Sequence, residues 1–271
     1  MIKRILIILV ITNFSSGLEA QSYQEKKAKD SLTIELVKKA FHSSELKSLN
    51  DLEELVHSIN RSEKQISIVR RNIEYGAEHQ IWWADILETK HEEHFSIIIQ
   101  NSEIIGVELG SSGIDKKMAS YISEERLQEL KSSKEEEFGA ISLSEDLLFP
   151  LEMKLFGHWC SIGGEPPEYC YRMLDLVNDR NKDQLRNWLL SFDPEIQAYG
   201  AEGLFYLQKE GISMNEEELK LIEKLKKINN TLIKCEGCFF YVRRNFKEDF
   251  SKKYLKRRYK SYKKSGWIYE K

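Results

Sequence analysis

All four cysteines of this chain lie between Phe156 and Cys238, and they constrain its fold more than any other feature. In an oxidising compartment, four cysteines usually form two disulfides. Each cysteine has a neighbour nearby in sequence, so we expect Cys160 to bond Cys170 and Cys235 to bond Cys238. The crossed pairings, which would join the start of this block to its end, stay open.

The same thiols could serve two other kinds of chemistry. A zinc site with four thiolates normally comes from two CxxC knuckles, whereas this chain has one, Cys235-Glu236-Gly237-Cys238. A redox-active CxxC lies at the start of a helix, where N–H groups stabilise the thiolate. Here the motif follows an expected helix, residues 219–233, and precedes an expected strand, residues 239–242. Structural disulfides are therefore favoured over zinc or redox chemistry.

Two antiparallel helices are expected between the two pairs of cysteines. Apolar residues recur at helical spacing over residues 184–191. Asp193 then occupies an N-cap position, and Pro194 the first helical position, where its missing N–H costs nothing. Gly200 and Gly203 each weaken the second helix by up to about 1 kcal/mol relative to alanine. We therefore expect a neighbouring helix to approach its backbone closely at these glycines.

The sequence LLSFDPEIQ at residues 189–197, followed by Ala201 and Leu204, resembles the core of a HEAT repeat. The resemblance covers one helical pair, residues 183–211, and departs from the family at Gln197, where arginine is usual. It implies an all-α module whose stacked helices present a binding face. With its flanking GEPP and CEGC segments, the block also resembles exported bacterial proteins of unknown function. Neither resemblance carries a catalytic residue.

Residues 1–20 have the layout of a signal peptide. Lys3 and Arg4 form a positive segment, an apolar run follows, and cleavage is expected after Ala20. The apolar run is too short for a transmembrane helix, which needs roughly 20 residues. We therefore expect an exported protein, periplasmic or extracellular, with no transmembrane segment after signal cleavage.

Residues 21–140 predict an α+β domain that begins with helices. Apolar residues at helical spacing, among them Leu32, Leu36 and Phe41, predict a first helix that packs on a sheet. Ser48 marks a turn before a second, short helix.

From residue 66 the apolar period changes to two, which predicts three or four antiparallel strands with a hairpin around Asn101. This element order is similar to cystatin-like or NTF2-like rolls, without a shared motif. A charged stretch at residues 116–137 predicts a linker helix. An all-α domain, residues 141–242, is expected to follow, with a helix at residues 151–159.

The expected sheet offers one candidate ligand pocket. A histidine beside a carboxylate can transfer protons, but an ordinary strand with one core and one surface tryptophan explains the same pattern. The candidate pocket residues are Tyr75, Glu78, His79 and Trp83. In the segment HEEH, His91 and His94 are three residues apart, whereas the zinc metalloprotease motif needs four on a helix. A solvated turn is therefore favoured there.

Residues 243–271 form a basic, aromatic tail. They hold 12 basic and 3 acidic residues, net +9, whereas residues 21–242 hold 27 basic and 40 acidic residues, net −13. The tail could dock on its own acidic body, bind an anionic envelope surface, lipid headgroup or acidic polysaccharide, or bind nucleic acid, although export argues against nucleic acid. The residues expected to meet an anionic partner are Lys252, Lys253, Lys256, Arg257, Arg258, Lys260, Lys263 and Lys264.

The sequence contains no G-x-S-x-G, P-loop or dinucleotide fingerprint, and we expect no cofactor or metal. The hypothesis that follows is an exported, non-enzymatic binding protein of unknown protein or envelope partner, which uses the helical module and the basic tail. The alternative is a small-ligand binder or enzyme with a pocket near Glu78, His79 and Trp83.

Overall fold

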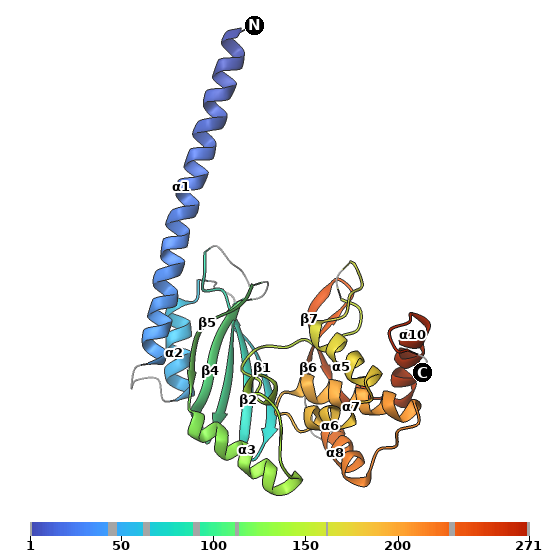
Figure 1. The fold of residues 1–271 in the computed structure, drawn as a ribbon. Coiled ribbons are helices and arrows are strands. Elements are labelled where there is room, and N and C mark those ends of the chain that lie inside the picture. Colours follow the sequence, from blue (N-terminus) through green and yellow to red (C-terminus); the bar gives the residue numbers. More distant parts are fainter. Residues whose placement is uncertain are drawn as a thin grey trace. The chain divides into compact units, whose positions relative to one another are not determined.

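The structure is a computed structural model. The described chain is α+β, with helices, a five-stranded antiparallel sheet and a two-stranded sheet (Figure 1). The structure describes residues 2–42, 48–61, 66–88, 93–111, 114–160, 162–227 and 231–269. The chain divides into two compact units. The first unit consists of Met1–Ile68, Trp82–Phe95 and Glu108–Tyr121. The second unit consists of Val69–Ile81, Ser96–Val107 and Ile122–Lys271. This division passes through the large sheet, and a domain boundary near residue 140 stays a prediction.

The large sheet is a meander in which the strands pair in sequence order. At the expected hairpin, Asn101 and Ser102 both have positive φ, 54° and 67°, which suits a tight turn between twisted strands. The strands are β1 (Ser67–Glu74), β2 (Ala77–Ala84), β3 (Glu93–Gln100), β4 (Glu103–Ser111) and β5 (Ile114–Ile122).

The fifth strand corrects the sequence interpretation. A helix was expected from residue 116, whereas residues 114–122 form β5 and helix α3 (Glu124–Phe138) begins only afterwards. Pairing with β4 provides hydrogen-bond partners for the backbone of this charged stretch, and this tertiary contact overrides the local helical pattern. Leu127 and Leu130 are buried on α3.

Two helices belong to the first unit. Helix α1 (Ile2–Phe41) is continuous, and α2 (Leu49–Ile59) begins at a capping box. In this box the Ser48 N–H donates to the Asp51 carboxylate at 2.7 Å, and the Ser48 hydroxyl oxygen accepts from the Asp51 N–H. The turn expected at Ser48 is therefore confirmed as a helix start.

The apolar stripe expected on α1 is buried only in part. Val37 and Phe41 are buried, and the Phe41 ring meets Phe95 edge to face at 6.5 Å. Leu32 and Leu36, by contrast, are 72 % and 49 % exposed. Leu36 lies one residue, or about 100° around the helix, from Val37, so both leucines fall on a neighbouring stripe.

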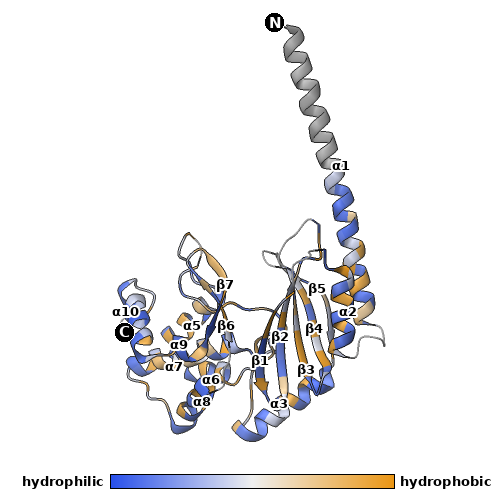
Figure 2. Cartoon of the chain, turned by 180° about the vertical axis from the view of Figure 1, so that it is seen from behind, coloured by the Kyte–Doolittle hydropathy of each residue, from blue (hydrophilic) through white to orange (hydrophobic). Residues whose placement is uncertain are grey.

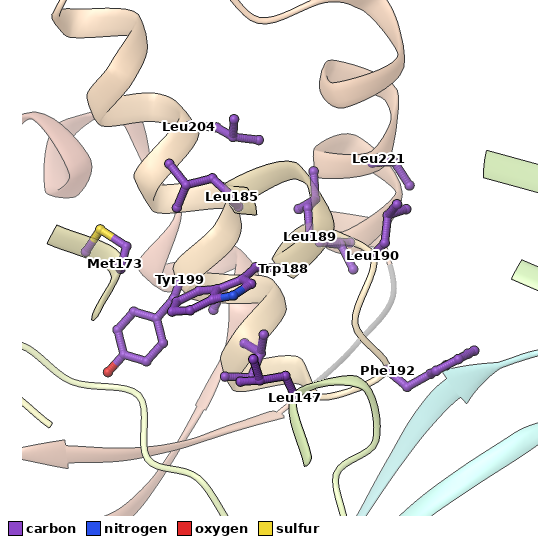
Figure 3. Packing of buried hydrophobic residues seen from close by; sticks show 14 of the residues in the cluster. Leu147, Met173, Leu185, Trp188, Leu189, Leu190, Phe192, Tyr199, Leu204 and Leu221 are labelled. Carbon is purple, nitrogen blue, oxygen red and sulfur yellow. The ribbon is translucent and has the colours of Figure 1, made fainter. Parts of the chain in front are cut away.

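The second unit has a single apolar core around the helical pair α6 and α7, part of which Figure 3 shows. The expected helix at residues 151–159 is absent from this described segment, because the Phe156 N–H donates to the Ile233 carbonyl and pairs with strand β6 instead. The elements are α4 (Glu145–Leu148), α5 (Glu168–Asn178), α6 (Lys182–Leu189), α7 (Pro194–Lys209), α8 (Glu216–Lys227), β6 (Thr231–Glu236), β7 (Phe239–Asn245), α9 (Phe246–Asp249) and α10 (Lys252–Lys264).

The start of α7 confirms the local prediction. The Asp193 carboxylate accepts hydrogen bonds from the N–H groups of Glu195 and Ile196 at 2.9 and 3.0 Å, and Pro194 is the first helical residue. An added Cβ on Gly200 would lie 2.6 Å from the Leu189 nitrogen. The close helix approach expected at this glycine is therefore confirmed, whereas assignment of the pair to the HEAT family stays a prediction.

Helix α7 is buried on nearly all sides, so its carboxylates need partners inside the protein. Both Glu195 carboxylate oxygens accept from Arg71 Nη1, at 2.6 and 2.8 Å, and one also accepts from the Ile233 N–H at 2.7 Å. These bonds tie strand β1, helix α7 and strand β6 into one unit. Seven residues along α7, Glu202 makes a second buried ion pair.

Candidate binding site at the C-terminal helix

The segment expected as a tail is folded. Strand β7, helix α9 and helix α10 account for most of residues 243–264. Helix α10 begins where the Ser251 hydroxyl oxygen accepts from the Tyr254 N–H. Its buried residues, Leu255, Arg258 and Tyr262, are three and four residues apart and therefore share one face. Helix α10 thus packs into the second unit by that face.

Arg258 anchors α10 to the core helix α7. Its Nε lies 2.8 Å and its Nη2 3.2 Å from the two Glu202 carboxylate oxygens, and Nη2 also donates to the Asp249 carbonyl. Burial raises the pKa of Glu202, but Arg258, His158 and Tyr206 together outweigh burial and lower the pKa to about 2. The Tyr206 hydroxyl also donates to Glu202. Arg258 is therefore occupied by its own chain.

A histidine, a tyrosine and a cysteine continue this buried network. The Tyr262 hydroxyl lies 2.8 Å from His158 Nδ1 and 3.2 Å from Cys170 Sγ, and His158 Nε2 lies 3.3 Å from Glu202. Burial lowers the pKa of His158 and so favours the neutral imidazole, and this effect exceeds the opposing effect of Glu202. Nδ1 therefore contacts the Tyr262 hydroxyl, and Nε2 lies beside the Glu202 carboxylate.

The disulfide pairing expected from sequence proximity is wrong. The structure has a crossed disulfide, Cys160–Cys235, with 75 residues between its members. Parallel bridges from Phe156 and Cys160 to β6 and its turn bring these two cysteines together, which sequence separation does not reveal. Cys170 is a buried free thiol on α5, and Cys238 is an exposed one in the β6–β7 turn.

The thiols do not form a metal site in the described part of the chain. No group of three or more histidine, cysteine, aspartate or glutamate residues there could hold a metal ion. Of the HEEH segment, His91 and Glu92 lie outside the described residues. Glu93 and His94 begin β3 and are buried, which corrects the solvated turn expected for them; the Glu93 carboxylate accepts from the Ile86 N–H, and the His94 ring lies against Gly110.

A pocket of about 490 Å³ opens beside α10, within the range of roughly 300–1,000 Å³ typical of small-molecule sites. Trp159 and the β6–β7 turn at Gly237 line one side, and Tyr254 and Arg257 of α10 line another. Lys234 in its wall is fixed between two carboxylates, 2.7 Å from Asp249 and 2.8 Å from Glu236. Lys234 is therefore held in place within the pocket wall.

Most of the expected anionic-partner residues form one exposed face of α10. Lys263 contacts Glu210 at 2.9 Å and Arg258 contacts Glu202, so these two bind carboxylates of their own chain. At about 100° per residue, the other six span an arc of about 140°, away from the buried face. We call these six exposed residues the cationic face: Lys252, Lys253, Lys256, Arg257, Lys260 and Lys264.

The candidate pocket residues of the large sheet are engaged elsewhere. His79 is fully buried, with Nε2 2.8 Å from the Ser96 hydroxyl. The Tyr75 hydroxyl donates to Glu137 and Glu78 accepts from Gln80. Trp83 is partly buried, next to the fully buried Trp82, as expected of an ordinary strand. These four residues do not line the pocket beside α10.

Glu202, Tyr262 and Asp249 belong to this site but were not predicted from the sequence. A signal existed in α10, because Leu255, Arg258 and Tyr262 recur at helical spacing and mark a buried face with one cation in it. Glu202 lies 56 residues from Arg258 in sequence, so no local pattern indicated this pair.

No protein family, curated protein or solved structure matches the chain. Within the described ranges, no helix is long and apolar enough to cross a membrane. The expected signal peptide covers residues whose side chains lie outside the described part, and it stays a prediction.

Proposed function

We propose that this is an exported, non-enzymatic binding protein that uses the cationic face of α10 to bind an anionic partner. The observation that carries this proposal is that, among the described residues, the buried cation of α10 is ion-paired, whereas its exposed cations are not. Its inward cation, Arg258, is neutralised by Glu202, whereas the cationic face makes no ion pair within the described residues. A helix that had evolved only to dock on the acidic body would direct its cations toward that body's carboxylates.

Six cations on one helical face produce a local positive potential even though the whole chain is slightly acidic. Binding through such a face is electrostatic, so it weakens as salt shortens the Debye length to about 8 Å at physiological ionic strength. The pocket adjoins this face at Arg257, where a charged group of the partner could be held next to Trp159 and Tyr254.

Export is supported by the Cys160–Cys235 disulfide, because disulfides persist in oxidising compartments. The geometry around His158 supports a binding rather than a catalytic role, since both ring nitrogens face Tyr262 and Glu202. The sheet alternative near Glu78, His79 and Trp83 gains no comparable support.

Deletion of residues 243–271 would be a poor test, because it removes Arg258 and leaves Glu202 buried without its counter-ion. The proper variant replaces Lys252, Lys253, Lys256 and Lys260 with glutamine, which keeps the helix and removes four charges. Its matched control replaces four exposed lysines outside α10 in the same way: Lys26, Lys27, Lys39 and Lys220.

Retention on immobilised heparin, a polyanion, is measured for the wild type and both variants over a range of salt. We expect the α10 variant to lose at least about tenfold in affinity and to show a shallower salt dependence. The control variant should behave as the wild type does. Equal retention of the two variants, or a wild type that does not bind, would refute the proposal.

A further inference from the structure

Several large apolar side chains project into solvent near the cationic face. Ile162 is 94 % exposed, Phe239 is 73 % exposed and Trp159 is 42 % exposed. Ile162 lies in the short loop between Cys160 and Glu165, and Phe239 follows the turn of the β6–β7 hairpin, whose hydrophobic end Figure 2 shows. Exposed isoleucine and phenylalanine at adjacent loop ends indicate an interaction site.

Covalent and hydrogen bonds hold these two loops together. The Cys160–Cys235 disulfide joins them, and the Gly237 N–H donates to the Trp159 carbonyl at 2.8 Å. The Cys160 N–H also donates to the Glu165 carbonyl at 2.9 Å, which closes the loop that carries Ile162. We call the set of exposed residues Trp159, Ile162 and Phe239 the apolar tip.

The apolar tip and the cationic face border the same pocket. Trp159 and Gly237 line it from the tip, and Tyr254 and Arg257 line it from α10. Phe239 lies only two residues beyond Gly237. Exposed apolar side chains therefore lie close in sequence to one wall of the pocket, and cations of α10 line another.

We propose that the anionic partner is a phospholipid bilayer, with the apolar tip entering the interface while the cationic face binds anionic headgroups. This inference rests on the proposed function and adds the chemical class of the partner. A bilayer supplies both surfaces required, because headgroup charge lies directly above an apolar phase that interfacial residues enter by roughly 5–10 Å. An acidic polysaccharide would satisfy the cations and leave Ile162 and Phe239 in water.

Aromatic residues at the tip suit this depth, since tryptophan and tyrosine favour the membrane–water interface. Trp159 is fixed there by stacking on Tyr262, with ring centroids 5.5 Å apart and planes 15° from parallel. The disulfide keeps the tip from folding back onto the protein. The protein would therefore bind the bilayer without a large rearrangement.

The test uses the full-length oxidised protein and co-sedimentation with vesicles of phosphatidylcholine alone or mixed with phosphatidylglycerol. The tip variant carries Ile162→Ser and Phe239→Ser. Its matched control carries Leu32→Ser and Leu219→Ser, two leucines that are 72 % and 45 % exposed elsewhere on the surface. All four side chains are outside the core, and thermal unfolding verifies that each variant is folded.

We expect the wild type to bind phosphatidylglycerol vesicles, and the tip variant to bind them at least about tenfold more weakly, because two large side chains no longer leave water. The tip variant should retain wild-type affinity for heparin, whereas the lysine-to-glutamine variant of α10 should lose affinity for both. The leucine control should bind vesicles as the wild type does.

The two proposals fail in different ways. Vesicle binding that the tip variant leaves unchanged would overturn the bilayer inference while the cationic face stood. Heparin binding without any vesicle binding would do the same and identify a polysaccharide-like partner. If the α10 variant binds heparin as tightly as its control variant does, the proposed function itself is refuted.

Discussion

Gly200 on α7 allows the closest approach in the helical core, and its replacement by alanine gives a sharp test. The added Cβ would lie 2.6 Å from the Leu189 nitrogen, 2.8 Å from the Leu185 carbonyl oxygen and 3.0 Å from the Trp188 carbonyl carbon. All three atoms belong to the backbone of α6. Ordinary contacts begin at 3.4 Å, so the two helices must separate by 3.4 − 2.6 = 0.8 Å.

The cost follows from that separation. A gap of this size forfeits roughly a quarter to a half of the dispersion attraction across the interface, and overpacking a core typically costs about 1–3 kcal/mol. Alanine recovers up to about 1 kcal/mol through its better helix propensity. We expect Gly200→Ala to lower the free energy of unfolding by about 1–2 kcal/mol, and Tm by roughly 2–8 °C.

Gly203 provides the matched comparison. Its added Cβ would meet Leu185 at 2.4 Å, but the atom it meets is the end of a flexible side chain. Gly203→Ala should therefore lower the free energy of unfolding by less than Gly200→Ala does. The additional substitution Leu185→Ala should relieve the clash at residue 203. The same leucine variant should not relieve Gly200→Ala, where Leu185 contributes its backbone oxygen.

Urea unfolding of the oxidised proteins, followed by circular dichroism, measures the four free energies of each double-mutant cycle. A Gly200→Ala protein as stable as the wild type would refute the close-approach argument. Equal relief of both glycine variants by Leu185→Ala would show that the clash is with the side chain in each case.

Three further predictions concern the cysteines and the buried carboxylate. Cys160→Ser opens the disulfide with 75-residue separation, so urea unfolding should show a loss of about 4 kcal/mol; a variant as stable as the oxidised wild type would contradict this. Alkylation with mass detection should label Cys238 in the native protein and Cys170 only after denaturation, because burial raises the pKa of the Cys170 thiol and shields it; native labelling of Cys170 would be inconsistent with the packing. Glu202 has a pKa of about 2 in the folded protein, below the ordinary value of 4.5 for a glutamate, so its contribution to stability is complete above about pH 4.5 and is lost as pH falls toward 2. Glu202→Gln should therefore lower the free energy of unfolding by about 3–5 kcal/mol at pH 7 and make it depend less on pH between about 2 and 4.5. An unchanged dependence on pH would argue against the ion pair.

Features set by nearby residues could be predicted from the sequence. Asp193 and Pro194 start α7 because a cap and a fixed φ act within three residues. The hairpin at Asn101 and the turn at Ser48 follow the same logic. Gly200 was predictable too, because a glycine inside a strong helical pattern needs a reason such as close packing.

Features set by distant residues were not predictable. Residues 116–122 have a helical pattern, and only pairing with β4 makes them a strand. Cys160 bonds Cys235 rather than Cys170 because β6 lies beside residues 156–160. For the candidate site, the cationic residues were evident from composition, but their division between a buried anchor and an exposed face depends on where Glu202 lies.

The placement of the two carboxylates on α7 has a consequence for the order in which the chain folds. Glu195 meets Arg71, which is synthesised 124 residues earlier, whereas Glu202 meets Arg258, which is synthesised 56 residues later. At about 5–20 residues per second, α7 would leave the ribosome several seconds before its second counter-ion exists. Until then the core would contain an unpaired buried carboxylate, which no compact state tolerates cheaply. We therefore expect the second unit to complete its folding only after its last helix has been made, and a prematurely terminated chain to be more open to proteases than the full chain.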